Sequence, residues 1–158
     1  MIYNIIKDVT TVQKGVIAHG CNCLGIMGAG VARAIRFTWP KAYTQYIMLC
    51  AKYSDSTEML GMVQTVQVGN DEGFKDLYIA NCFTQEKCGS DGKVYADLDA
   101  ITEVLGNVIA FAESKNLPLY MPKIGSGLGG LQYERDVLPI LKELAKDSDI
   151  DIYVCDLK

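Results

Sequence analysis

Ile124-Gly-Ser-Gly-Leu-Gly-Gly130 decides how this chain folds, because it places four glycines directly after an apolar, strand-like segment. A second glycine-rich stretch, Gly25-Ile-Met-Gly-Ala-Gly-Val31, stands about a hundred residues earlier, and each stretch precedes a helix-like segment. Since glycine has no Cβ, the backbone N–H groups of such loops approach phosphate oxygens closely, and a following helix N-terminus adds unpaired donors. Two such loops closing on one ligand indicate a diphosphate.

The segments around the two loops predict strands and helices in the order ββααββαβαβ. Strands are expected at residues 1–6, 15–19, 62–68, 76–83, 117–124 and 150–155, and helices at 28–38, 40–50, 97–113 and 133–144. Asn70-Asp-Glu-Gly73 predicts a hairpin turn, so the third and fourth strands should pair antiparallel. Strands interleaved with helices predict a mixed sheet covered on both faces, with the ligand at the carboxyl ends of the strands.

The size and charge of the chain narrow its class. Its 158 residues, 49% of them hydrophobic, suit one domain over residues 1–158. The net charge of −4 argues against duplex nucleic acid as the main partner, although local backbone amides still hold a small anion. No apolar stretch is long enough to span a membrane, so no membrane partner is expected.

The six cysteines lack paired C-x-x-C spacing, and no signal peptide precedes them. This pattern is typical of reduced thiols in the cytoplasm. Cys21-Asn-Cys23 lacks a second Cys/His pair at ligand spacing, and the chain has one histidine. We therefore expect neither a metal nor a cofactor.

Other phosphate and nucleotide chemistries fit less well. Gly125 to Gly130 matches the G-x-G-x-x-G pattern, but only 28 residues follow it, too few for a dinucleotide-binding fold. No P-loop string occurs, and no arginine stands six positions after Cys21, Cys23 or Cys82, which excludes the cysteine-phosphatase mechanism. The remaining candidate for proton transfer is a histidine.

His19 lies at the predicted end of an apolar strand, just before the first glycine loop. Two interpretations stay open from its position alone: a packed, hydrogen-bonded histidine, or a proton-transfer group beside the ligand. In the second case, the reaction should show an ionisation near neutral pH. Asn22, in the same junction, is a candidate hydrogen-bond donor to a ribose hydroxyl.

Four blocks of sequence together resemble the macrodomain family, which binds ADP-ribose. They are Lys7-Asp-Val-Thr10, His19-Gly-Cys-Asn22, Gly28-Ala-Gly-Val-Ala32 and Pro122-Lys-Ile-Gly-Ser-Gly-Leu-Gly-Gly-Leu131. The resemblance spans almost the whole chain and implies a three-layer α/β/α fold around a six-stranded mixed sheet. It also implies that ADP-ribose, or its 1''-phosphate, is the partner, and we expect the chain to be a monomer.

The resemblance carries over residue by residue. Asp8 corresponds to the aspartate that bonds the adenine amino group, and Asn22 to the asparagine near the distal ribose. Cys155 stands where the family has an aromatic residue that stacks on adenine, with Tyr153 nearby. The ligand-binding residues implied in this way are Asp8, Val9, Gly28, Ala29, Gly30, Val31, Ile124, Gly125, Ser126, Gly127, Leu128 and Gly129.

His19-Gly-Cys-Asn-Cys23 is similar to the branch of the family that hydrolyses ADP-ribose 1''-phosphate. That similarity implies a phosphatase with His19 and Asn22 as catalytic residues, His19 either protonating the leaving ribose oxygen or activating water. Where deglycosylating members have a lysine and an aspartate, this chain has Gln85 and Gly129, although Lys87 is close. A deglycosylase acting on protein or nucleic acid, and a module that only binds ADP-ribose, remain the alternatives.

Overall fold

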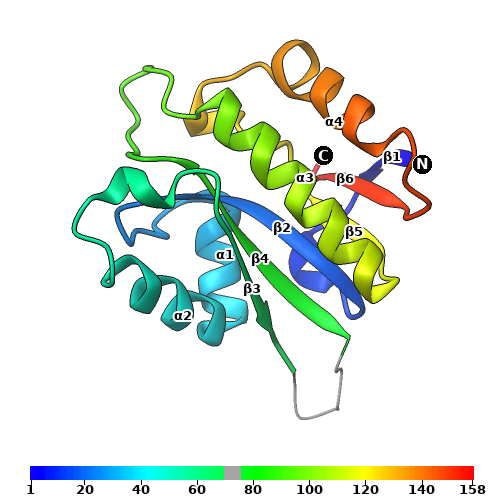
Figure 1. The fold of residues 1–158 in the computed structure, drawn as a ribbon, viewed down its shortest axis with the longest axis horizontal. Coiled ribbons are helices and arrows are strands. Elements are labelled where there is room, and N and C mark those ends of the chain that lie inside the picture. The colour runs from blue at the N-terminus through cyan, green and yellow to red at the C-terminus, as the bar shows by residue number, and fades with distance from the viewer. Residues whose placement is uncertain (70–75) are drawn as a thin grey trace.

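A computed structural model describes residues 1–69 and 76–158. Within these residues, six strands form one sheet with the order β1-β6-β5-β2-β4-β3 (Figure 1). The strands are β1 (Ile2–Ile6), β2 (Gly15–Asn22), β3 (Val63–Gln67), β4 (Leu77–Gln85), β5 (Leu119–Met121) and β6 (Ile152–Asp156). β3 pairs antiparallel with β4, whereas the other neighbours are parallel. The predicted six-stranded mixed sheet and antiparallel pair are confirmed, and the Asn70–Gly73 turn lies outside the described residues.

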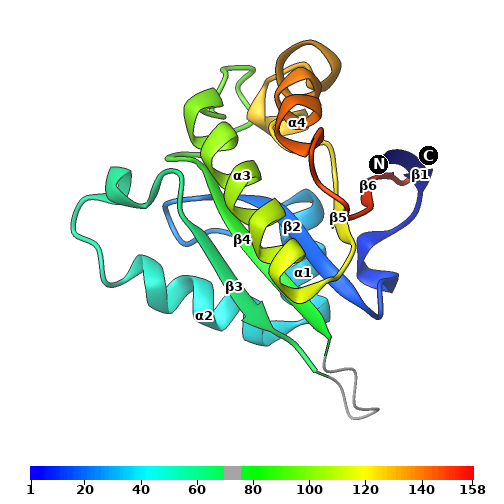
Figure 2. The ribbon, with the colours of Figure 1, turned by 45° about the vertical axis from the view of Figure 1, so that its right-hand side comes forward.

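Helices cover both faces of this sheet, as expected. The helices α1 (Gly30–Thr38) and α2 (Pro40–Cys50) lie on one face, and α3 (Leu98–Lys115) and α4 (Leu138–Ala145) on the other (Figure 2). The break between α1 and α2 falls where the sequence predicts it, because Pro40 has no N–H and suits the first helical position. The predicted element order and three-layer fold are therefore confirmed.

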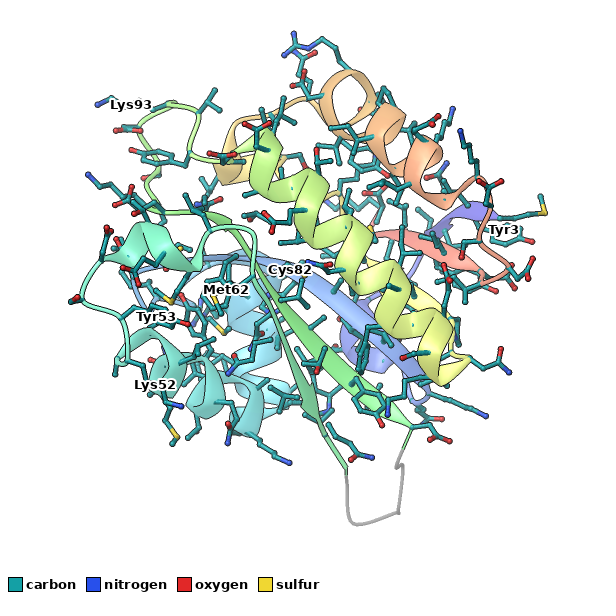
Figure 3. All side chains as sticks on the ribbon, in the orientation of Figure 1. Tyr3, Lys52, Tyr53, Met62, Cys82 and Lys93 are labelled. Atoms are coloured by element: carbon teal, nitrogen blue, oxygen red, sulfur yellow. The ribbon has the colours of Figure 1, made fainter. Side chains whose placement is uncertain are left out.

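Successive side chains of β2 point to opposite faces of the sheet, so this strand packs against the helices on both sides. Val16 and Ala18 pack in the cluster that contains α3 and α4, whereas Ile17 packs with α1 and α2. On β4, Cys82 lies on the α3 side of the sheet (Figure 3). Burial on both faces is the reason these strands read as near-continuous apolar runs.

Prolines shorten one predicted strand and divide one predicted helix. β5 covers only Leu119–Met121, since Pro118 and Pro122 on either side have no N–H for the ladder. The last predicted helix is divided into a π-helical turn, Tyr133–Val137, followed by α4. Pro139 explains the division, because a proline there removes the hydrogen bond that a continuous α-helix requires.

The strand β2 is longer than the sequence predicts. It continues past His19 to Asn22 and pairs with β4 throughout, with an irregularity between Cys21 and Asn22. His19 therefore lies inside the sheet rather than at its end. In the described part of the chain, no helix is long and apolar enough to cross a membrane.

Candidate functional site

A cavity of about 650 Å³ lies at the carboxyl ends of β2, β4, β5 and β6, and we call it the cleft. Its wall includes the first loop at Gly28–Ala32, the second loop at Ile124–Gly129, the end of β4 at Thr84–Gln85 and the end of β6 at Cys155–Leu157. The volume is in the range of sites that hold a small organic ligand. The two glycine loops thus meet at one cavity, as their positions after strands predict.

The first loop presents a helix end without a side-chain cap to the cleft. Ala29 is the N-cap of α1 and makes no side-chain capping bond, while Gly30 adopts a φ of +58° that favours glycine. The first N–H groups of an α-helix have no partner within the helix, and here they belong to Gly30, Val31 and Ala32, which line the cleft. These donors and the positive end of the helix dipole favour an anion at this point.

Tyr46 on α2 fixes the shape of the first loop. Its hydroxyl accepts the N–H groups of Gly25 and Ile26, each at 3.1 Å, and lies 2.7 Å from the carbonyl oxygen of Asn22. The Asn22 side chain is bound into the same loop, with Nδ2 donating to the Ile26 carbonyl at 2.8 Å. Its Oδ1 accepts from the Leu24 and Ile26 N–H groups. Asn22 therefore organises the loop, and its second amide hydrogen is the one left for a ligand.

The second loop is a tight turn rather than a helix start. Gly125 has a φ of +85°, and a Cβ on it would lie 2.9 Å from the end of the Ile101 side chain, so a larger residue would be strained there. Residues Gly127–Gly129 form a single 3₁₀ turn whose N-cap, Ser126, turns its hydroxyl away to the Lys123 carbonyl at 2.5 Å. The next helical turn begins at Tyr133, where the sequence predicts the start of the last helix. The donors of this loop are consequently those of the short turn.

His19 lines the cleft but is 1% exposed. Its Nε2 lies 2.6 Å from Oδ1 of Asn81 on β4. Burial lowers the pKa of His19 to about 4, against the raising effect of the Asn81 hydrogen bond. The side chain is thus both hydrogen-bonded and beside the cleft, and its lowered pKa disfavours the expected ionisation near neutral pH, because a buried imidazole resists its positive charge.

The buried thiols of Cys21 and Cys23 stay protonated. Burial raises the pKa of Cys21 well above its ordinary value and that of Cys23 to about 12. The six cysteines, all within the described residues, are free. Because the thiolate is the nucleophilic form, these buried groups offer no cysteine nucleophile, in agreement with the spacing argument.

The basic side chain in the cleft is already neutralised. Among the described residues of the wall, Lys123 is the one lysine or arginine, and its Nζ lies 3.1 Å from Glu134 and 3.3 Å from Asp156. The two carboxylates raise the pKa of Lys123. Attraction for an anion therefore comes mainly from the backbone donors of the loops.

Asp8 and Val9 are not part of the wall of the cleft. The Asp8 carboxylate caps the short 3₁₀ turn Val9–Thr11, accepting from the Thr10 N–H at 2.9 Å and from its hydroxyl at 2.7 Å. These bonds lower the pKa of Asp8. Val9 is buried in the core beside α1. The structure brings together the other sequence-predicted site residues and leaves these two outside.

The cleft also contains residues that the glycine motifs did not identify. Thr84, Gln85, Cys88 and Asp156 line it from the ends of β4 and β6 and from the segment that follows β4. The signal that locates them is topological, because they follow parallel strands whose carboxyl ends lie at the same edge of the sheet as the loops.

The two positions that separate the family branches can be located. Gln85 lines the cleft and donates from Nε2 to the Lys87 carbonyl at 2.7 Å, whereas the Lys87 side chain is not in the wall. Gly129 is buried, and a Cβ on it would lie 3.3 Å from that of Ala96. The second loop therefore has little room for a side chain at position 129.

Comparison with known proteins agrees with this geometry. A protein from Scheffersomyces stipitis that is named ADP-ribose 1''-phosphate phosphatase is 29% identical to this chain over 154 residues, which cover 88% of this chain and 87% of that protein. One with the same name from Lodderomyces elongisporus is 32% identical over 147 residues, covering 89% and 87%. The structure of a macrodomain protein from Streptomyces coelicolor is 28% identical, with a TM-score of 0.78 over 99% of each chain. The family model described as the Macro domain matches residues 18–138, and the chain therefore belongs to the macrodomain family.

Proposed function

We propose that this chain is a phosphatase that hydrolyses ADP-ribose 1''-phosphate to ADP-ribose and phosphate. The observation that carries the proposal is the presence of both glycine loops and His19 in one cleft. Relatives that cover most of the chain carry the name of this activity. The ligand-binding residues inferred from the sequence are part of the proposal, with Asp8 and Val9 as the two that the cleft does not support.

The two loops suit the anionic parts of such a substrate. The N–H groups at the start of α1 and those of Gly127 and Leu128 are separate donor sets in one cavity, since the Gly129 N–H already donates to the Ser126 carbonyl. A diphosphate and a terminal phosphate supply more than one anionic group to them. Charge that develops on phosphate oxygens is stabilised by such fixed donors without reorganisation.

In this hydrolysis, the role of His19 is to hold the attacking water. A water oxygen held by His19 forms a bond to the terminal phosphorus, the bond from phosphorus to the ribose oxygen breaks, and the water proton is transferred to that ribose oxygen. Since phosphoryl transfer depends mainly on positioning and charge stabilisation, a neutral imidazole that accepts a hydrogen bond from water is sufficient. Its pKa of about 4 argues against His19 as an acid at neutral pH.

Phosphate release from ADP-ribose 1''-phosphate tests the proposal. The wild type should release phosphate, and His19→Gln should lose about a hundredfold or more of kcat while still binding ADP-ribose in a calorimeter. Lys52→Ala is the matched control, because Lys52 is exposed and outside the cleft wall (Figure 3). Binding of ADP-ribose without phosphate release would leave a binding module, and release of ADP-ribose from a modified protein in its place would leave a deglycosylase.

A further inference from the structure

Asn81 is a fully buried polar side chain on β4, between β2 and β3 of the sheet (Figure 1). Its Nδ2 lies 3.2 Å from the carbonyl oxygen of Ala42 on α2 and 3.1 Å from Oε1 of Gln64 on β3. A backbone carbonyl only accepts hydrogen bonds, so the atom facing Ala42 is the amide nitrogen. The orientation of the Asn81 amide is therefore fixed.

Gln64 supports the same orientation from the other side. Its own Nε2 donates to the Gln45 carbonyl at 2.9 Å, which leaves Oε1 facing Asn81. Two backbone carbonyls of α2, those of Ala42 and Gln45, thus determine which way both amides point. The Oδ1 of Asn81 is left facing β2.

That oxygen determines where the proton of His19 lies. Asn81 Oδ1 is 2.6 Å from His19 Nε2, and an amide oxygen cannot donate, so Nε2 carries the hydrogen. A neutral imidazole has one N–H, and its other nitrogen keeps a lone pair. The Cys21 thiol lies 3.8 Å from Nδ1 and 3.6 Å from Nε2, and because a thiol is only a weak donor, the lone pair on Nδ1 stays available.

We infer that Asn81 is a positioning residue that holds His19 as the Nε2–H tautomer and leaves Nδ1 as the proton-accepting atom of the ring. The use of Nδ1 to hold the attacking water rests on the proposed function, whereas the tautomer does not. An amide suits this task because it orients the ring without adding a negative charge that would favour imidazolium. The burial of His19 acts in the same direction.

Nitrogen NMR of isotope-labelled histidine tests the tautomer directly. The chain has one histidine, so all the signals belong to one ring, and only its two nitrogens need to be told apart. In the wild type at neutral pH, Nε2 should appear as the protonated, pyrrole-type nitrogen and Nδ1 as the unprotonated, pyridine-type nitrogen. A protonated Nδ1, or a ring that averages the two tautomers, would overturn the inference without any variant.

Asn81→Leu tests whether Asn81 causes the preference. It keeps a similar volume but removes the acceptor, so the two nitrogen signals should move toward averaged values. The matched control is Gln64→Leu, which leaves the Ala42 carbonyl to orient Asn81, and the tautomer should stay as in the wild type. A folded Asn81→Leu protein, checked by circular dichroism, that still shows pure Nε2–H would refute the role of Asn81.

Activity separates this inference from the proposed function. Asn81→Leu should lower kcat for phosphate release by about ten- to a hundredfold with little change in KM, as loss of an orienting partner does. An inactive wild type with the Nε2–H tautomer would contradict only the phosphatase. An active wild type with the proton on Nδ1 would contradict only the inference.

Discussion

The hydroxyl of Tyr46 lies 2.7 Å from the carbonyl oxygen of Asn22, and this contact ties α2 to the end of β2. The same hydroxyl accepts two N–H groups of the first glycine loop, from Gly25 and Ile26. The hydroxyl of the fully buried Tyr46 thus fixes the conformation of the first loop. The first loop is shaped by a residue that does not line the cleft.

Tyr46→Phe should loosen the first loop while leaving the core filled. The variant removes one oxygen and leaves the Gly25 N–H without its acceptor, while the Ile26 N–H keeps Asn22 Oδ1, at a cost of about 1–3 kcal/mol in the free energy of unfolding. ADP-ribose should bind more weakly, because the loop must then be ordered by the ligand. Denaturant unfolding and calorimetry measure the two effects. Tyr43→Phe on the same helix is the control, and an unchanged affinity in Tyr46→Phe would contradict the role given to the hydroxyl.

Stability should fall between about pH 6.5 and pH 4 because of His19. Its pKa is about 4 in the folded protein and near 6.5 in the unfolded chain, so the unfolded chain binds the proton first as the pH drops. The stability is fully present above pH 6.5, and about 3 kcal/mol is lost by the acid end of this window. Urea unfolding at a series of pH values measures it. His19→Gln should remove the slope, and a slope that persists in that variant would assign it to other groups.

Gly125→Ala should mainly lower stability, whereas Gly28→Ala should mainly weaken ADP-ribose binding. Alanine at position 125 meets both a φ of +85° and a contact of 2.9 Å to Ile101, so stability should fall by about 2 kcal/mol. At Gly28 the nearest atom would be 3.5 Å away, so the fold should tolerate alanine there. The Cβ should still weaken ADP-ribose binding by crowding the approach to the backbone. Equal stability losses for the two variants would contradict this distinction.

Gly129→Asp should not convert the protein into a deglycosylase. The new Cβ would lie 3.3 Å from that of Ala96, and the carboxylate would enter a buried position. Thermal unfolding should show a loss of at least about 1 kcal/mol, with no release of ADP-ribose from a modified protein. Gly106→Asp, at a glycine of α3 that has no positive φ and where an added Cβ meets open space, is a control for the added charge. Deglycosylation by Gly129→Asp would show that the loop adapts.

The sequence predicts the sheet, its helices and the meeting of the two loops, because these depend on local periodicity and on where strands end. It does not predict the surroundings of His19, since Asn81 is 62 residues away and reaches it only through the pairing of β2 with β4. Tyr46 is similarly remote from the loop that it holds. The role of Asp8 toward adenine stays a prediction from the family motif, which gave no sign that the Asp8 carboxylate also caps its own turn.

The uncapped start of α1 has a consequence for mutational surveys of the cleft. Its donors are main-chain groups of Gly30, Val31 and Ala32, and truncating side chains does not remove them. An alanine scan of polar residues would therefore show no loss of ligand binding at this half of the cleft. Variants that add atoms to glycines reveal it, so genetic tolerance along this loop should follow the size of the incoming residue rather than its charge.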